Sequence, residues 1–129
     1  MNIEYFREGI DIVASSGMKL TPEQILLIEN SLIILQNENH YRHIFFWGRI
    51  NGIENDYFIA FGYTTDCLVE RKFYYSINCF EWIILPPSCH QFNEACIYCL
   101  EMFIGDPSVS ITIELVTILY FHFTIFAIC

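Results

Sequence analysis

The chain has 129 residues, of which 54% are hydrophobic and 17% aromatic, so it can build one packed domain, and a disordered chain is excluded. Its formal charge of -9 at pH 7, with only six Lys and Arg, argues against a nucleic-acid-binding surface, which needs clustered cations. Six cysteines follow an N-terminus that has charges where a secretory signal has an apolar run. We therefore expect an intracellular protein with free thiols rather than a disulfide scaffold.

The first predicted element is an amphipathic helix at the start of the chain. Its apolar residues recur every three or four positions and so lie on one face: Ile3, Phe6, Ile10 and Val13. We expect Gly17 to end this helix, because glycine readily takes the left-handed conformation at a helix C-terminus.

A second helix is predicted from an unusually complete set of start signals. Thr21 is expected as the N-cap, Pro22 in the first turn and Gln24 as the capping-box partner of Thr21. The face predicted to be buried carries Ile25, Ile28, Leu32 and Leu35. Because Leu26 and Ile33 widen this apolar stripe, we expect the helix to pack against neighbours on two sides.

From residue 43 the sequence pattern changes to that of β-strands. Residues 44–50 and 57–63 are rich in aromatic and branched side chains and predict a first hairpin. Residues 72–77 and 81–85 predict a second pair, which ends where Pro86-Pro87 stops the ladder. The four segments indicate a four-stranded antiparallel meander.

A third helix is predicted after the meander. Ser88 and Gln91 can form another capping box, and apolar residues repeat at helical spacing as far as Phe103, before Gly105 and Pro107. The element order indicates an α+β fold, with two N-terminal helices, four antiparallel strands and one further helix, the helices packing on one side of the sheet.

Paired thiols at Cys96 and Cys99 have the spacing of zinc ligands or of a disulfide-exchange motif. A structural zinc site needs a second ligand pair, for which Cys89 and His90 are the only nearby candidates. Both Cys96 and Cys99 also fall on the apolar face of the third predicted helix. We therefore interpret them as core cysteines and expect no metal and no cofactor.

No arrangement in the sequence favours an enzyme. The histidines lack an adjacent nucleophile elbow or oxyanion loop: His40, His43, His90 and His122. Glu54 and Asp56 lie beside Gly52 in a segment typical of a turn rather than of an acid/base pair. Phosphate-binding and dinucleotide-binding glycine motifs do not occur.

Aromatic residues are dense in the predicted strands. If one sheet face packs on the helices, the other still carries large rings, which is typical of a protein interface. The alternative is that both faces are covered within the fold, and the sequence leaves both open. The candidate partner-interface residues are Trp47, Arg49, Tyr57, Tyr74 and Trp82.

Residues 109–129 differ from the rest, because Glu114 is their only acid and no charge follows it. As a helix this tail would reach about 31 Å, close to the roughly 30 Å core of a bilayer. A tail-anchored membrane protein is therefore an alternative function, although the many β-branched residues suit strands equally well. We expect a module over residues 1–108 and a divergent tail over 109–129.

Several sequence strings of the predicted hairpins carry a family likeness. They are Phe46-Trp47-Gly48-Arg49-Ile50, Asp56-Tyr57-Phe58-Ile59-Ala60, Arg71-Lys72, Glu81-Trp82, Leu85-Pro86-Pro87 and Phe103-Ile104-Gly105-Asp106-Pro107-Ser108. In order and spacing they resemble radial spoke head protein 9 homologs. The resemblance covers residues 41–108 and extends more weakly to the N-terminal helices.

This resemblance implies a non-catalytic structural subunit of the axonemal radial spoke head in the cytoskeleton of cilia and flagella, where it supports motility. It implies no cofactor, and it implies other radial spoke head subunits of the 4/6 type as partners. Family chains continue with a polar segment after the string that ends at Ser108, whereas this chain turns apolar at Val109. We therefore expect a truncated or alternative form of such a subunit.

Overall fold

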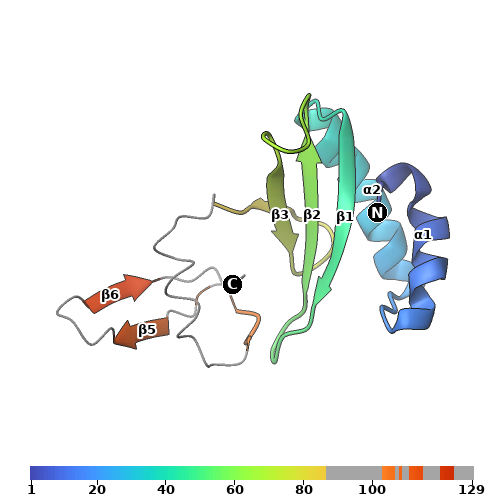
Figure 1. Cartoon of the computed structure of the whole chain (residues 1–129). Helices are drawn as coiled ribbons and strands as arrows, with labels where there is room; N and C mark the ends of the chain where they lie inside the picture. The colour runs from blue at the N-terminus through green and yellow to red at the C-terminus, as the bar shows by residue number, and fades with distance from the viewer. Residues whose placement is uncertain (87–102, 107, 109–110, 115–119, 124–129) are drawn as a thin grey trace. The chain divides into compact units, whose positions relative to one another are not determined.

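The structure, a computed structural model, describes residues 1–86, 103–106, 108, 111–114 and 120–123 (Figure 1). It divides the chain into two compact units, Met1–Ile50 with Tyr57–Leu85, and Asn51–Asp56 with Pro86–Cys129. The first unit has the α+β architecture predicted from the sequence. The third predicted helix, with Cys96 and Cys99, lies outside the described residues.

The N-terminal segment is helical from Ile3 to Ser16. It consists of the short helix η1 (Ile3–Tyr5), the helix α1 (Phe6–Val13) and the short helix η2 (Ala14–Ser16). Gly17 ends it with a φ of 101°, which confirms its predicted role. The predicted apolar face is also confirmed, since Ile3, Phe6 and Ile10 are buried.

The second helix, α2 (Pro22–Glu38), begins with the predicted capping box. The Gln24 backbone N–H donates to Thr21 Oγ1 at 3.2 Å, and the Thr21 N–H donates to Gln24 Oε1 at 3.0 Å. These bonds satisfy two donors that a helix start otherwise leaves unpaired. On the surface, Arg7 of α1 bridges to Glu29 of α2 with an N–O distance of 2.7 Å.

Only one face of α2 is buried. Ile28 and Leu32 are fully buried, and Leu35 and Ser31 nearly so. The helix contacts both η1 and the sheet, as predicted for packing on two sides. The prediction that Leu26 and Ile33 take part in this packing is wrong, because they are 51% and 44% exposed. They point away from the centre of the buried face.

The sheet contains four antiparallel strands in the order β1-β2-β3-β4, with the helices on one side of it (Figure 1). The strands are β1 (His43–Ile50), β2 (Tyr57–Tyr63), β3 (Lys72–Ser76) and β4 (Ile83–Ile84). The last strand is shorter than the predicted 81–85. Trp82 leaves the ladder because its indole turns toward α2, where Nε1 donates to Ser31 Oγ at 2.8 Å.

The core of this unit lies between the helices and one face of the sheet. The rings of Phe6 and Phe46 meet edge to face with centroids 5.4 Å apart. Tyr41 lies so close to Gly62 that a Cβ there would come within 2.7 Å of the tyrosine ring. Glycine at position 62 is therefore required by the packing of Tyr41 against β2.

The segment that links β1 to β2 belongs to the second unit. The N–H groups of Ile53 and Glu54 donate to the carbonyls of Phe103 and Ile104 at 3.0 and 2.7 Å. A Cβ on Gly105, whose φ is 82°, would collide with the Asn55 carbonyl oxygen. Only glycine allows this close approach and this φ, which gives a structural reason for the glycine before Asp106.

Two further strands, β5 (Ile111–Glu114) and β6 (Tyr120–Phe123), form an antiparallel pair in the second unit. The membrane-anchor alternative requires a single helix over residues 109–129, and it is not favoured because these two segments are strands. Among the residues that the structure describes, no helix is both long and apolar enough to cross a bilayer.

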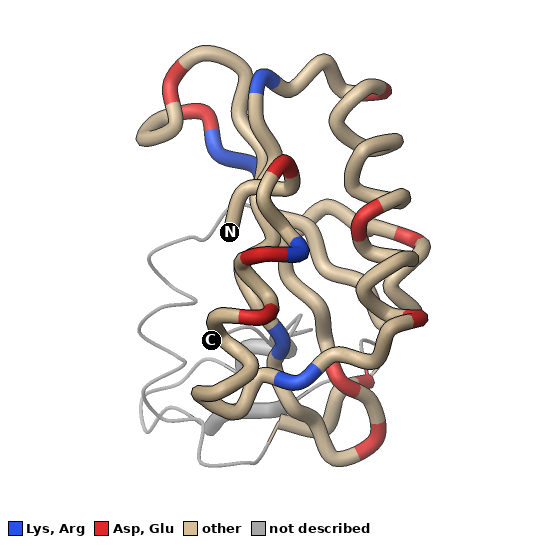
Figure 2. Tube along the Cα trace, turned by 90° about the vertical axis from the view of Figure 1, so that its right-hand side faces the viewer, with Lys and Arg blue, Asp and Glu red and all other residues tan. Residues whose placement is uncertain are grey.

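Charged residues are spread over the described part of the chain. Figure 2 shows Asp and Glu on both helices and in the loops, with the Lys and Arg positions among them and two of these adjacent in the chain. That pair is Arg71-Lys72 at the start of β3.

Candidate partner interface

The sheet face that points away from the helices carries a row of aromatic rings. Phe45, Phe61 and Phe73 are cross-strand neighbours on β1, β2 and β3. The rings of Phe45 and Phe61 are stacked with centroids 5.1 Å apart, and those of Phe61 and Phe73 are 5.4 Å apart. We call these three residues, together with Tyr63, the aromatic row.

Strand alternation explains the row. Successive side chains point to opposite faces, so Ile44, Phe46 and Ala60 enter the core while their neighbours face outward. Tyr63 extends the row, with its ring 6.1 Å from that of Phe45. All members of the row are half-buried, so part of each ring remains available for contact.

Arg71 lies over the end of the aromatic row. Its guanidinium carbon is 5.9 Å from the ring centroids of both Phe61 and Phe73. Such cation–π contacts orient an exposed arginine without burying its charge. The row therefore ends in a positive group on a chain that is acidic as a whole.

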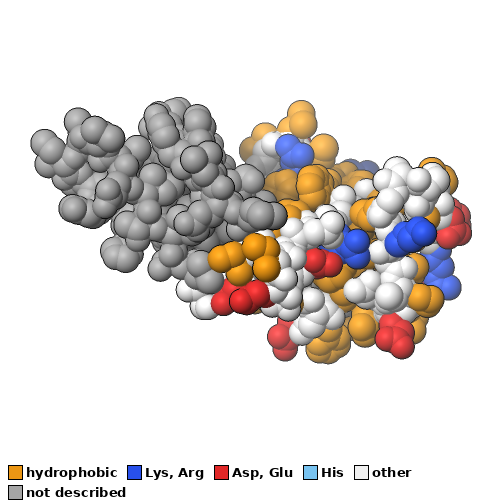
Figure 3. Space-filling model, turned by 90° about the horizontal axis from the view of Figure 1, so that it is seen from below, with side chains coloured by type: hydrophobic (Ala, Val, Ile, Leu, Met, Phe, Trp, Pro, Cys, Tyr) orange, Lys and Arg blue, Asp and Glu red, His pale blue; other side chains and the backbone are white. Residues whose placement is uncertain are grey.

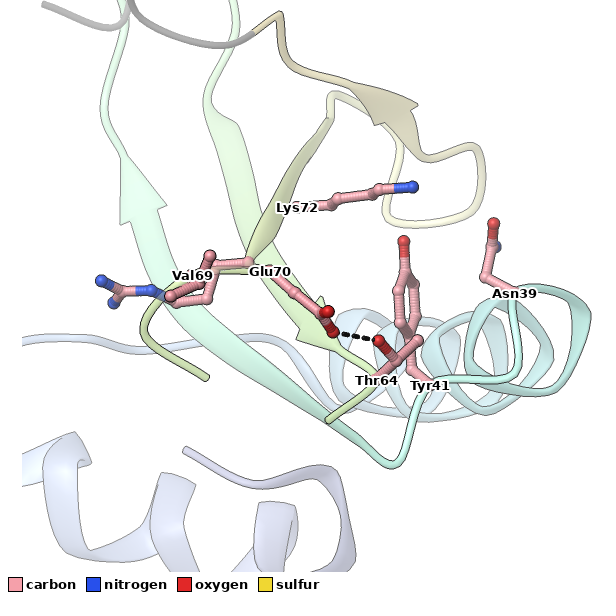
Figure 4. A pocket seen from close by; sticks show the side chains of 7 residues that line it. Asn39, Tyr41, Thr64, Val69, Glu70 and Lys72 are labelled. Atoms are coloured by element: carbon pink, nitrogen blue, oxygen red, sulfur yellow. Dashed lines mark hydrogen bonds between the residues drawn. The ribbon is translucent and has the colours of Figure 1, made fainter. Parts of the chain in front are cut away.

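The loop that precedes Arg71 is held by one carboxylate. Glu70 accepts a hydrogen bond from the Thr64 hydroxyl, which is the dashed line in Figure 4. It also accepts from the Thr65 hydroxyl at 2.8 Å and from the Thr65 N–H at 3.2 Å. These bonds, the one from Thr64 first, lower the pKa of Glu70 to about 2. The braced loop fixes the position of Arg71 and presents the exposed side chains of Leu68 and Val69.

A shallow pocket of about 370 Å³ lies beside this loop. Figure 4 shows its lining side chains, which come from the C-terminal end of α2, the loop and β3: Asn39, Tyr41, Thr64, Val69, Glu70, Arg71 and Lys72. The carboxylate is already engaged by the threonines, and no histidine or cysteine lines the pocket. The lining therefore offers neither a nucleophile with its base nor a metal-ligand set.

Trp47 is the most exposed of the predicted interface residues, at 59%. The β1–β2 register shifts between Phe46 and Gly48, so Trp47 is the extra residue of a β-bulge on the edge strand. The bulge interrupts the alternation and turns this large ring to solvent. The prediction that Trp47 serves as an interface anchor remains consistent with its position.

Arg49 and Tyr57 are less accessible than Trp47. The Arg49 guanidinium donates to the Lys19 carbonyl at 3.2 Å and so ties β1 to the loop before α2. The Tyr57 ring stacks on Tyr75 with centroids 5.2 Å apart, and both residues are buried.

Tyr74 and Trp82 belong to the core of the first unit. The Tyr74 hydroxyl lies 2.6 Å from that of Tyr41, and burial, with this hydrogen bond, raises the pKa of Tyr74. Trp82 donates to Ser31, whose hydroxyl also lies 2.9 Å from the Cys79 carbonyl oxygen. Trp82 thus holds the sheet to α2, whereas Tyr74 bonds to Tyr41 in the segment before β1, and a role for either ring in partner binding stays a prediction.

Sequence reasoning missed the centre of the aromatic row. It selected Trp and Tyr residues and an arginine by type, whereas Phe61, Phe73 and Arg71 form the most connected part of the surface. The signal was present in the strand register, because Phe61 and Phe73 occupy matching outward positions once β2 and β3 are aligned, and Arg71 comes directly before β3. Exposed hydrophobic side chains also occur elsewhere, as the face in Figure 3 shows, so residue type alone does not select the site.

Within the described residues, no group of three or more His, Cys, Asp and Glu could hold a metal ion. Cys67 and Cys79 are free thiols there, the first exposed and the second buried. The surface is therefore best described as apolar and aromatic with one cationic edge, which suits binding to another protein.

Comparison with known proteins identifies close resemblance to one group. The chain is 36% identical over 109 residues to the radial spoke head protein 9 homolog of Danio rerio, which covers 84% of this chain and 39% of that protein. It is 34% identical over 108 residues to the homolog of Bos taurus and 36% over 100 residues to that of Homo sapiens. The chain thus spans about two fifths of the length of these curated relatives. No family model matches it.

Proposed function

From the similarity of four fifths of this chain to radial spoke head protein 9 homologs, we propose that it is a structural component of the radial spoke head, in the axoneme of cilia and flagella. It acts there by holding neighbouring spoke proteins in fixed geometry, and so supports spoke assembly and ciliary motility. The observation that carries this proposal is the 36% identity over 84% of the chain.

The proposed role is non-catalytic. A scaffold subunit acts through interface area rather than through a reacting group. The aromatic row, its cationic edge at Arg71 and the exposed ring of Trp47 supply such an area. Large rings and arginine are the residue types that contribute most at protein interfaces, which supports this surface as the partner site.

The partners proposed are radial spoke head subunits of the 4/6 type. These 129 residues match 39% of the relatives' length, so by themselves they supply only part of the contact surface of a relative. Losing a few kcal/mol of contact weakens binding several hundredfold. We therefore expect weak capture of a 4/6-type subunit and poor rescue of motility in cells that lack the full-length relative.

A pull-down with the complete chain tests this proposal. Arg71→Glu and Trp47→Ala should each reduce capture of a 4/6-type subunit by about tenfold, since each removes an interface group without opening the core. Phe80→Ala is the matched control, because Phe80 is 61% exposed but lies outside the aromatic row. Capture should be unchanged in this control.

Two results would contradict the proposal. Capture that is insensitive to both Arg71→Glu and Trp47→Ala would place the partner surface elsewhere. No capture of any radial spoke protein by the parent chain would remove the structural role itself.

A further inference from the structure

The outer face of α2 carries an apolar surface that the sheet does not use. Leu26, Leu27, Ile33 and Ile34 are between 41% and 54% exposed. The two leucines precede the two isoleucines by seven residues, so all four lie on one side of the helix, with Asn30 between them. We call these five residues the outer stripe.

The outer stripe is symmetric about Asn30. Leu26 and Ile34 are each four residues from Asn30, and Leu27 and Ile33 are each three residues from it. If two copies of α2 cross antiparallel at Asn30, Leu26 of one copy faces Ile34 of the other, and Leu27 faces Ile33. This is the self-complementary arrangement that a two-fold symmetric dimer requires.

The local charge distribution permits a second copy on this face. The chain carries a formal charge of -9, so two copies repel overall, and a neutral contact is the one that adds no further repulsion. The charged residues on the outward side of α2 are at its ends, Glu23 and Glu38, and none lies within the outer stripe. By contrast, the exposed surface of α1 carries Glu8 and Asp11.

Asn30 suits the position on the axis. An amide group both donates and accepts, so two Asn30 side chains related by a two-fold axis can bond to each other. A single asparagine within an apolar helix seam fixes the register of paired helices. Leu and Ile on either side then supply the apolar contact, as in the seam of a two-stranded helical pair.

We propose that the outer stripe of α2 is a self-association surface, on which a second copy of this chain pairs antiparallel about an axis at Asn30. A helix of 17 residues is about 25 Å long, and four half-exposed aliphatic side chains per copy cover less than the roughly 800 Å² per partner of a standard interface. The dimer is therefore weak, with a dissociation constant above about 10 µM.

Substitutions on the axis give a decisive test. A dimer of the Asn30→Lys variant would bring two ammonium groups together on the axis, and a dimer of the Asn30→Glu variant would bring two carboxylates together. Because like charges repel, each variant alone should be monomeric. A mixture of the two variants pairs the ammonium group of one copy with the carboxylate of the other and should dimerise again. Asn30 is exposed and both new residues favour helix, so the fold should be retained, which circular dichroism checks.

The experiment is sedimentation velocity of the complete chain from about 1 µM to about 1 mM, the range over which so small an interface dissociates. Co-precipitation of two differently tagged, co-expressed copies gives a second readout. Ile34→Glu should weaken dimerisation by at least about tenfold. Ile12→Glu is the matched control, since Ile12 is 75% exposed on α1, outside the outer stripe, and should leave dimerisation unchanged.

Three results would overturn the proposal: a parent chain that stays monomeric at the highest concentration, self-association that is unaffected by either Asn30 variant, and a mixture of the two variants that does not recover the dimer. A parent chain that is monomeric but binds another protein through the outer stripe would assign this face to a different partner and equally refute self-association.

Discussion

The inner and outer faces of α2 carry the same types of apolar residue, but the inner face is buried and the outer face is exposed. Ile28 and Leu32 on the inner face are fully buried, whereas Ile33 and Ile34 on the outer face are about half exposed. Their hydrophobicity is the same, so the difference comes from what the tertiary structure places opposite each face. An apolar residue on a helix thus predicts a contact but does not predict whether that contact is made within the same chain.

The two faces also differ in their polar residues. Ser31 on the inner face is buried and bonds to Trp82 and to the Cys79 carbonyl. Asn30 on the outer face is exposed. A buried polar group is tolerated because both of its hydrogen bonds are supplied by the fold. Substitutions of adjacent residues on the two faces should therefore give different results.

The largest expected difference is between Leu32→Ala and Ile33→Ala. Leu32→Ala should lower the free energy of unfolding by about 2–5 kcal/mol, because it leaves a cavity in the core. Ile33→Ala should change it by about 0.5 kcal/mol or less, since the side chain is half exposed and alanine favours helix. Denaturant unfolding at low protein concentration measures both, and equal effects would contradict the distinction between the faces.

The next test concerns Cys79, which is packed in the core below the inner face. Burial raises the pKa of the Cys79 thiol from 9.0 to about 11, which lowers its thiolate fraction at neutral pH by about a hundredfold. Alkylation followed by peptide mass spectrometry should label Cys67 before Cys79. Because the folded-state pKa is raised, the stability that this thiol contributes is present below pH 9.0 and is lost as pH rises through about 11.

A smaller effect is expected for Ser31→Ala. The change removes the acceptor of Trp82 Nε1 and the donor to the Cys79 carbonyl, and it should cost about 1–3 kcal/mol because the indole N–H is left without its partner. Trp82 fluorescence provides a direct readout of the altered contact. Asn30→Ala is the neighbouring control and should be nearly neutral when the chain is monomeric. A neutral Ser31→Ala would show that the Ser31 bonds add no net stability.

The smallest effect is expected at the start of α2, which both faces share. Thr21→Ala removes the capping box and should reduce the free energy of unfolding by about 1 kcal/mol. Thr21→Ser keeps the hydroxyl and should retain most of the stability. Thermal unfolding followed by circular dichroism measures both. If the two variants lose equal stability, the hydroxyl hydrogen bond is not the source of the effect.

Local signals in the sequence predicted most of the first unit. The Thr21 capping box, the end of the first helical segment at Gly17 and the span of β2 are all confirmed, because each depends on residues close together in the chain. The length of β4 was overestimated. The strand-forming residues of this segment did not indicate that Trp82 bonds to Ser31 of α2, because these two residues are 51 positions apart in the chain.

The aromatic row likewise combines features that the local sequence indicates with features that depend on long-range contacts. The aromatic residues of the strands left open whether the second sheet face is exposed or covered, and the connection of Phe61 and Phe73 through Arg71 required the register of β2 and β3. Tyr74 and Trp82 matched the residue types of interface anchors, yet the fold uses both rings in the first unit, where Tyr74 bonds to Tyr41 and Trp82 bonds to Ser31 of α2. Residue type indicates what a side chain can do, and its neighbours in space decide which use is made of it.

The sequence by itself determined the order of helices and strands in the first unit, the caps of its helices and the likeness to radial spoke head protein 9 homologs, because these follow from residue identity and short-range spacing. Only the tertiary structure decided which side of α2 enters the core and which outward rings form one surface. Burial depends on long-range packing, in which the sheet has one face for the helices and α2 can press only one of its two apolar sides against it.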